Sequence, residues 1–250
     1  MAGHNKWSKV KHIKARVDAR RGKIFSRFSQ EISIAARDGG GDPSLNPRLR
    51  TAIEGAKSHS MPKENIVRAI KKGTGELDGE AIQEVTYEGY GPGGIALIVE
   101  VTTDNTNRSA SKVREIFTKN GGSTATPGSV TYQFDRKGEI RIPMDGRTEE
   151  EMMEIVLEAG AENIQSDPEE YIISSGAADL SSVANALQQA GMNPSSQQLI
   201  SVPQNPSMID EVKAAKQALR LYEVLDDYED TMNVFTNFEI SDEVLSQLED

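Results

Sequence analysis

Apolar residues recur every three or four positions in three stretches between residues 23 and 78, a period that predicts short amphipathic helices. The first stretch ends at the glycines of 39–41, and the next two begin at Pro47 and Pro62, because proline is favoured in a first helical turn. The apolar positions of the first helix are Ile24, Phe28, Ile32 and Ala35. Three such helices can cover one another's apolar faces, so we expect a small helical bundle over residues 23–78.

Strand-like runs replace the helical period beyond residue 80. Residues 82–87 and 95–101 are rich in β-branched and apolar side chains, and the glycine-rich stretch 88–94 joins them. A helix with Asn107 as its N-cap follows, and residues 129–134 read as a further strand. These elements predict a ββαβ unit.

The most regular pattern lies between residues 136 and 203. Thr148 and Glu151 have the spacing of a capping box at the start of one helix, and Asp179 is placed to cap a second. The expected strands are 139–142, 161–166, 171–174 and 196–202. The resulting order, βαββαβ, is that of ferredoxin-like domains.

The segment 205–240 holds one more amphipathic helix and one more strand, which cannot fold alone. We infer that it returns to complete the ββαβ unit, through hinge-like junctions at 135–138 and 203–206. The predicted fold class is therefore α+β: an N-terminal helical bundle plus two α/β domains, the third, ferredoxin-like, inserted into the second. The predicted boundaries are a basic arm over 1–22, a helical domain over 23–78, an α/β domain over 79–135 plus 204–240, an inserted domain over 136–203 and an acidic tail over 241–250, which can form a short helix.

Composition narrows the chemistry. The 250 residues include no cysteine and only three histidines, so thiolate metal sites, disulfides and a cysteine nucleophile are excluded. The longest apolar run, 95–99, is too short to cross a membrane. The glycine-rich stretch 88–94 is followed by a strand and not by a helix, unlike a dinucleotide-binding loop, and we interpret it as a tight connection that needs positive φ angles. We therefore expect no cofactor, no metal and no membrane partner.

Charge is divided unequally along the chain. Residues 1–75 carry 17 Lys and Arg against 6 Asp and Glu, a balance of +11, whereas residues 76–250 carry 11 against 33, a balance of −22. A basic segment attached to an acidic body indicates a polyanion partner for the basic segment. The acidic body would be repelled by the same polyanion, so we expect the contact to be one-sided. The alternative is that the basic run is only a solvated charged surface.

Within the basic segment, nine cations precede residue 28 against one acid, Asp18. The candidate nucleic-acid contacts are Lys6, Trp7, Lys9, Lys11, Lys14, Arg16, Arg20, Arg21, Lys23 and Arg27. On a continuous helix, one stripe would be formed by Arg16, Arg20, Lys23 and Arg27. Gly22 disfavours a helix there, so residues 1–22 can instead be an extended arm that orders on a partner. Trp7 can stack on a base or anchor the arm to the protein surface.

A second candidate contact lies on the helix after residue 104. It comprises Asn105, Arg108 and Lys112, with Lys119 further along the same helix. The alternative interpretation is that these cations only neutralise Glu115 and the carboxyl end of the helix.

Several blocks of the sequence resemble one known family. They are 1–7 (MAGHNKW), 21–25 (RGKIF), 39–43 (GGGDP), 46–50 (NPRLR), 87–94 (YEGYGPGG), 104–108 (DNTNR) and 233–239 (NVFTNFE). Together they are similar to the YebC/PmpR family, and their order and length make the resemblance specific. Because the match begins at Met1, we expect Met1 to be the native start.

The resemblance implies a three-domain α+β fold and a cytoplasmic, DNA-binding transcriptional regulator. Some members, including the mitochondrial translational activator of cytochrome c oxidase, look like ribosome-associated translation factors instead. Neither role is that of an enzyme, so the resemblance implies no enzyme activity. The departures, such as Asn5 where serine is frequent and Arg16-Val17 where alanines are frequent, keep the charge of the arm.

Three hypotheses follow from the residues and the resemblance. The first is a DNA-binding transcriptional regulator whose arm neutralises phosphates, giving affinity but little sequence information. The second is a ribosome-associated translation factor that binds ribosomal RNA, because the acidic body discourages wrapping of duplex DNA and no helix presents an evident base-reading surface. The third is a protein-interaction scaffold.

Overall fold

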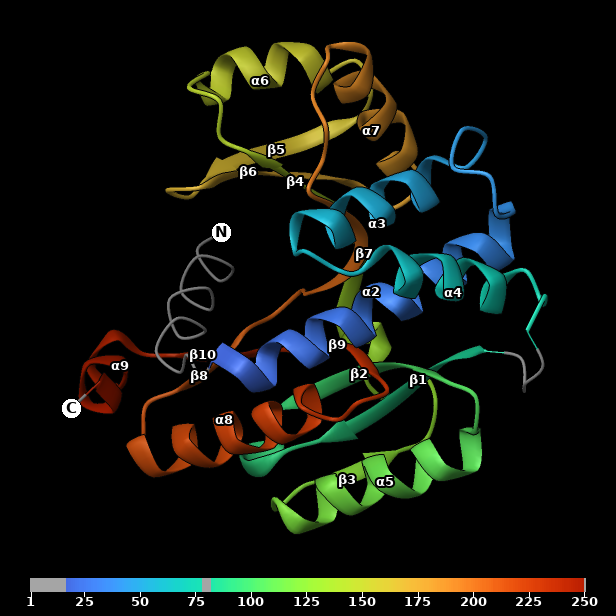
Figure 1. Ribbon diagram of the computed structural model, residues 1–250. Coiled ribbons are helices and arrows are strands. Elements are labelled where there is room, and N and C mark those ends of the chain that lie inside the picture. Colours follow the sequence, from blue (N-terminus) through green and yellow to red (C-terminus); the bar gives the residue numbers. More distant parts are fainter. Residues whose placement is uncertain (1–16, 78–81, 250) are drawn as a thin grey trace. The chain divides into compact units, whose positions relative to one another are not determined.

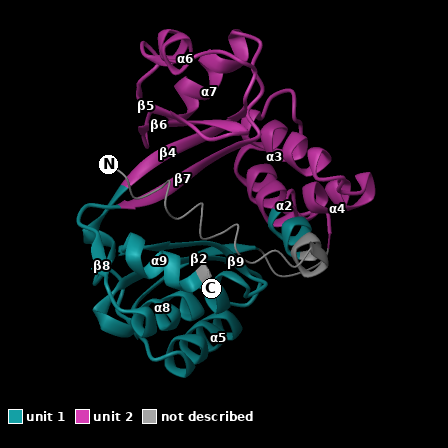
Figure 2. Cartoon of the chain, turned by 90° about the vertical axis from the view of Figure 1, so that its left-hand side faces the viewer, with its two compact units in different colours: residues 1–27, 79–135, 203–250 teal, residues 28–78, 136–202 magenta. Residues whose placement is uncertain are grey.

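A computed structural model describes residues 17–77 and 82–249, and their side chains from Lys23 to Leu248 apart from that gap. The described residues fall into two compact units, shown in two colours in Figure 2. Unit 1 contains the described parts of 1–27, 79–135 and 203–250, and unit 2 contains those of 28–78 and 136–202. Unit 2 combines most of the predicted helical domain with the predicted inserted domain, so the two units do not test the predicted domain boundaries one by one. Those boundaries stay predictions.

Three helices form the N-terminal part of the described chain (Figure 1): α2 (Val17–Gly39), α3 (Pro47–Ser58) and α4 (Lys63–Gly73). Asn46 caps α3, accepting a hydrogen bond at 3.0 Å from the backbone N–H of Leu49 and donating its amide to the carbonyl of Ala35. Helix α2 continues through Gly22 and begins five residues before it, so the last part of the expected arm is helical.

A four-stranded sheet of unit 1 has the order β3-β1-β2-β9. Its strands are β1 (Gln83–Tyr90), β2 (Ala96–Thr103), β3 (Ser123–Ala125) and β9 (Thr231–Thr236). Helices α5 (Thr106–Lys119) and α8 (Val212–Asp226) cover one face of it, where Val99, Phe117 and Leu221 are fully buried (Figure 1). The expected return of the C-terminal segment is confirmed, because β9 pairs with β2.

Two local expectations in this unit are wrong. The stretch expected as a strand at 129–134 contains instead the 3-10 turn η2 (Thr131–Gln133), and the strand that follows α5 in this sheet is β3. The N-cap of α5 is Asn105 and not Asn107. Periodicity could not place this strand, because the backbone near 128–131 bends around a buried carboxylate from another strand.

The inserted segment has the expected βαββαβ order. Its elements are β4 (Phe134–Pro143), α6 (Glu149–Val156), β5 (Ala161–Ser166), β6 (Glu170–Gly176), α7 (Leu180–Gln189) and β7 (Ser196–Pro203). The sheet order β5-β6-β4-β7 brings the first and third strands together at its centre, and the predicted α+β fold class is confirmed. The Thr148–Glu151 capping box is present, whereas Asp179 occupies the N-cap position of α7 without a side-chain capping bond.

The remaining described elements belong to unit 1. They are η1 (Pro92–Gly94), β8 (Ser207–Ile209), β10 (Phe238–Ile240) and α9 (Asp242–Glu249). Gly93 and Gly94 both have φ of 76°, which explains the glycines of this connection. The first junction is not a loop, because β4 runs through residues 135–138 without a break.

Along the described ranges, none of the helices has the length and apolar character needed to span a membrane.

Candidate nucleic-acid interface

The predicted contacts divide according to what the structure describes. Lys6, Trp7, Lys9, Lys11, Lys14 and Arg16 lie outside the described residues. Arg20 and Arg21 lie in the first turns of α2, and only their backbone is described. Their contact with nucleic acid therefore stays a prediction.

Lys23 and Arg27 are held by an acidic side chain about 200 positions later in the sequence. Lys23 Nζ lies 2.9 Å from Asp226 Oδ2, and Arg27 Nη2 lies 2.6 Å from Asp226 Oδ1. Arg27 Nε also donates to the carbonyl of Thr231 at 3.4 Å. These bonds fasten the first part of α2 to the end of α8 and the start of β9. We call Lys23, Arg27 and Asp226 the α2 clamp.

The α2 clamp is largely withdrawn from solvent, with side chains 18% exposed for Lys23, 28% for Arg27 and 20% for Asp226. Burial, aided by the nearby charge of Arg27, lowers the pKa of Lys23 below its usual range, although Asp226 opposes this. Burial alone would raise the pKa of Asp226, but the two cations outweigh it and the pKa is lowered. The lowered pKa of Asp226 favours its charged form, and two of the predicted phosphate contacts, Lys23 and Arg27, also have a structural task.

Replacing Asp226 with alanine is expected to destabilise the protein by about 2 kcal/mol, because two half-buried cations lose their anion. Thermal unfolding followed by circular dichroism measures the loss. Asp227→Ala is the matched control: its carboxylate is 80% exposed and lies 3.5 Å from Lys23. The control is expected to cost less than about 0.5 kcal/mol. Equal losses in the two variants would contradict the clamp.

The second candidate contact is built around Asp230. Arg108 Nη2 lies 3.0 Å from Asp230 Oδ2 and 3.1 Å from Asp104 Oδ1. Asp230 also accepts from Thr103 and Tyr228, at 3.0 and 2.7 Å. The hydrogen bond and charge of Asp230 raise the pKa of Arg108, so the guanidinium is permanently charged. Half of its side chain is still exposed, so a phosphate could reach it, but much of its charge is already balanced.

The other two residues of this candidate also have partners in the structure. The side chain of Asn105 accepts from the backbone N–H of Arg108 at 3.0 Å and so caps α5. Lys112 pairs with Glu115 at 3.2 Å, and Lys119 pairs with the same carboxylate at 2.6 Å. Hydrogen bonds from both lysines lower the pKa of Glu115. The proposed nucleic-acid contact at Asn105, Arg108 and Lys112 stays a prediction.

Sequence reasoning missed a set of exposed cations on α8. Lys213, Lys216 and Arg220 follow the i, i+3, i+7 spacing that places side chains on one face of a helix. No hydrogen bond or ion pair joins these three side chains to any other described residue. The spacing alone could have found them, but the excess of acids around them concealed the signal.

Sequence reasoning also missed Glu88, which was expected in a loop and lies in β1. The residue is 5% exposed, and its carboxylate accepts from the backbone N–H groups of Gly128, Val130 and Thr131 at 2.6, 2.6 and 3.0 Å. Burial by itself raises the pKa of Glu88, but the three donors outweigh it and hold the pKa below its ordinary value. A carboxylate so fully bonded organises a loop; it is poorly suited to act as a base. Among the described residues, no group of three or more His, Asp or Glu side chains is arranged to hold a metal.

Two sequence-family models match the chain. Residues 5–76 match the TACO1/YebC protein N-terminal domain, and residues 82–238 match the TACO1/YebC second and third domain. Together the matches cover most of the 250 residues.

Similar proteins cover the chain from end to end. A probable transcriptional regulatory protein of Akkermansia muciniphila is 59% identical over 99% of this chain and 100% of its own length. One of Desulfotalea psychrophila is 47% identical over 99% of both chains. The crystal structure of a conserved hypothetical protein from Aquifex aeolicus has a TM-score of 0.82 and 46% identity, covering 93% of this chain and 96% of that one.

Proposed function

Since the chain belongs to the TACO1/YebC family, we propose that it is a non-enzymatic, nucleic-acid-binding regulator of gene expression that acts in the cytoplasm. The observation that carries the proposal is the charge division, +11 over residues 1–75 against −22 over the rest. Close relatives named as probable transcriptional regulatory proteins support a regulatory role.

The basic segment before residue 28 supplies the contact. Its lysines and arginines neutralise phosphates, and the release of counterions from the nucleic acid makes binding steeply dependent on salt. Because Lys23 and Arg27 are engaged by Asp226, the cations before them carry most of the contact. The α2 clamp then joins the end of this segment to α8 and β9 of the same unit.

Duplex DNA is the first proposed target, in agreement with the names of the relatives. The alternative target is structured ribosomal RNA. It is favoured by the acidity of the rest of the chain, which would repel a duplex that wraps around it. A purely protein-binding scaffold is the third outcome of the test.

A paired titration tests the proposal. Labelled full-length protein is titrated with duplex DNA and with purified ribosomes in one buffer at physiological salt. The arm variant carries Lys9→Glu, Lys11→Glu, Arg20→Glu and Arg21→Glu. It is expected to bind the true target about a hundredfold more weakly, and the slope of log affinity against log salt is expected to fall by about 3 to 4, because each lost phosphate contact removes nearly one unit.

A variant with the same change in net charge provides the control. It reverses four exposed cations of α3 and α4: Lys57, Lys63, Arg68 and Lys71. Tighter, arm-dependent binding to ribosomes would make translation the primary role. Tighter binding to DNA, with preference among sequences, would support transcription. If wild type and arm variant bind neither target, or if the control loses as much as the arm variant, the proposal fails.

A further inference from the structure

Most cations of unit 1 that follow α2 and the α4–β1 connection line one hollow. Residues 79–135 and 203–250 together contain 7 Lys and Arg against 19 Asp and Glu. Four of those seven line one surface hollow of about 690 Å³ between the end of α5 and the first half of α8: Lys119, Lys213, Lys216 and Arg220. A scattered distribution would only moderate the acidity of the surface, whereas this one makes a local positive site. We call it the α5–α8 groove.

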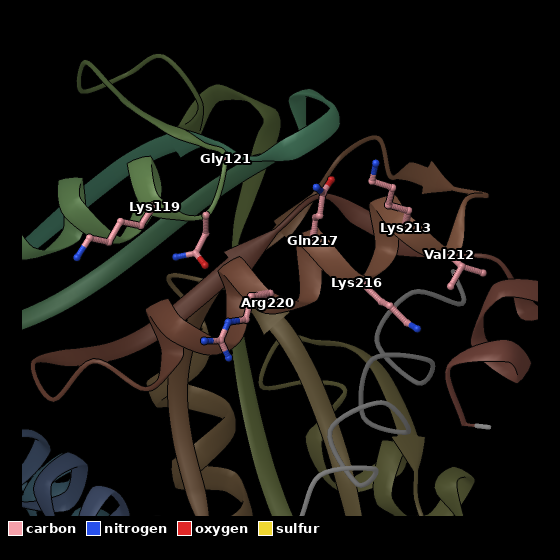
Figure 3. A pocket seen from close by; sticks show the side chains of 8 residues that line it. Lys119, Gly121, Val212, Lys213, Lys216, Gln217 and Arg220 are labelled. Atoms are coloured by element: carbon pink, nitrogen blue, oxygen red, sulfur yellow. The ribbon is translucent and has the colours of Figure 1, made fainter.

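The side chains of the α5–α8 groove come from two elements. Figure 3 shows Lys213, Lys216 and Arg220 spread along α8, with Lys119 and Gly121 coming from the end of α5. From residue 213 to residue 220 the helix advances about 10 Å at 1.5 Å per residue. One strand of a stacked duplex carries a phosphate about every 3.4 Å along its axis, so this row spans about three nucleotides.

The charges on α8 are available to a ligand. Lys213, Lys216 and Arg220 are exposed, and nothing in the described part of the chain forms an ion pair with them. Lys119 shares Glu115 with Lys112 but remains 72% exposed. The cations of the sequence-predicted second contact differ, since Arg108 is paired with Asp230 and Lys112 with Glu115.

Uncharged polar groups complete the hollow. The exposed amide of Gln217 lies between the cations of α8, and the side chain of Asn120 lies at the end of α5, where its Nδ2 donates to the carbonyl of Ile116. Gly121 has φ of 77°, so the chain turns sharply there without a side chain that would fill the space. Cations for phosphate and amides for sugar or base edges are the groups that nucleic-acid-binding surfaces combine.

We propose that the α5–α8 groove is a second nucleic-acid contact, in which Lys119, Lys213, Lys216 and Arg220 hold consecutive phosphates of one strand. The proposal rests on the proposed function and assigns part of the binding to the acidic remainder of the chain, residues 76–250. The α5–α8 groove allows a nucleic acid to contact this remainder despite its net negative charge. Its cations are more available than those of the helix face around Arg108.

The test compares two doubly reversed variants of the full-length protein. The groove variant is Lys216→Glu with Arg220→Glu, and the control is Arg68→Glu with Lys71→Glu, on exposed positions of α4. Both lower the net charge by the same amount. The probes are a fluorescein-labelled single-stranded RNA of 20 nucleotides and a duplex DNA of the same sequence, followed by fluorescence anisotropy over a range of salt.

The groove variant is expected to bind about tenfold more weakly to the probe that wild type prefers, and the slope of log affinity against log salt is expected to fall by about 2. The control is expected to change affinity by less than about twofold. Equal thermal midpoints establish that both variants are folded, and Lys216→Gln with Arg220→Gln should give a smaller loss in the same direction.

Equal losses in the groove and control variants would overturn the proposal, because they would reflect only the overall field. An unchanged groove variant beside a defective arm variant would overturn the groove and leave the proposed function standing. Absence of salt-dependent binding by wild type to both probes and to ribosomes would overturn both.

Discussion

Replacing Glu88 with alanine is expected to lower the free energy of unfolding by about 3–5 kcal/mol. The carboxylate is the acceptor for three backbone N–H groups, of which that of Val130 is buried. A buried N–H group that loses its acceptor lowers the stability by about 1–3 kcal/mol. The substitution also leaves a cavity where the buried side chain of Glu88 was packed. Urea unfolding followed by circular dichroism measures the loss.

Two further variants separate the causes. Glu88→Gln keeps the size of the side chain but puts an amide NH₂ against one set of N–H donors, so it should lose most of the same stability. Glu84→Ala removes an exposed carboxylate from the same strand and should cost less than about 0.5 kcal/mol. If Glu88→Gln is as stable as wild type, the three donors do not need the carboxylate.

The effect of Glu88 also depends on pH. Its folded-state pKa lies below the ordinary value of 4.5, so the stability it contributes is complete above about pH 4.5. That contribution is lost as the pH falls through the folded-state pKa, where the carboxylate is protonated. The difference in unfolding free energy between wild type and Glu88→Gln should therefore shrink as the pH falls below 4.5. A difference that stays constant below pH 4.5 would contradict the assignment.

Replacing Phe117 with alanine is expected to cost about 3–5 kcal/mol, the usual range for a buried aromatic ring. The ring is fully buried between α5 and the sheet of unit 1. It lies against a strand glycine: a Cβ at Gly89 would come within 2.5 Å of its Cε1. The small residue and the large ring therefore fit each other, and Gly89 has no side chain that could fill the cavity left by alanine.

The same unfolding measurement checks Phe117, with Tyr132→Ala as control. Tyr132 is 69% exposed, so its removal should change the unfolding free energy by less than about 0.5 kcal/mol. Phe117→Leu should fall between alanine and wild type, because it keeps part of the buried apolar area. A loss below about 1 kcal/mol for Phe117→Ala would mean that the helix repacks freely on the sheet.

Local interactions made much of the fold predictable. The start of α6 was predictable because its capping box depends on two residues three positions apart, Thr148 and Glu151. The burial of Phe117 follows from the helical period of the apolar positions in α5. The return of residues 205–240 was predictable because an amphipathic helix and a strand need a partner, and the ββαβ unit lacked both. These signals are contained in short windows of sequence.

Long-range pairs were not predictable in the same way. Glu88 was placed in a glycine-rich loop because nothing near it in sequence shows that three N–H groups forty residues later surround its carboxylate. The same contact turned the expected strand 129–134 into a bend. Residues 105 and 107 are both asparagine, and only the backbone geometry shows that Asn105 is the helix cap.

The sequence by itself determined the family resemblance, the α+β class and the division of charge between a basic beginning and an acidic remainder, because these depend on composition and on neighbours along the chain. Only the tertiary structure decided which cations are already used. Asp226 holds Lys23 and Arg27, Asp230 holds Arg108, and the row on α8 has no described partner. An ion pair depends on distance in space, and the folded topology brings together charges that lie more than a hundred residues apart.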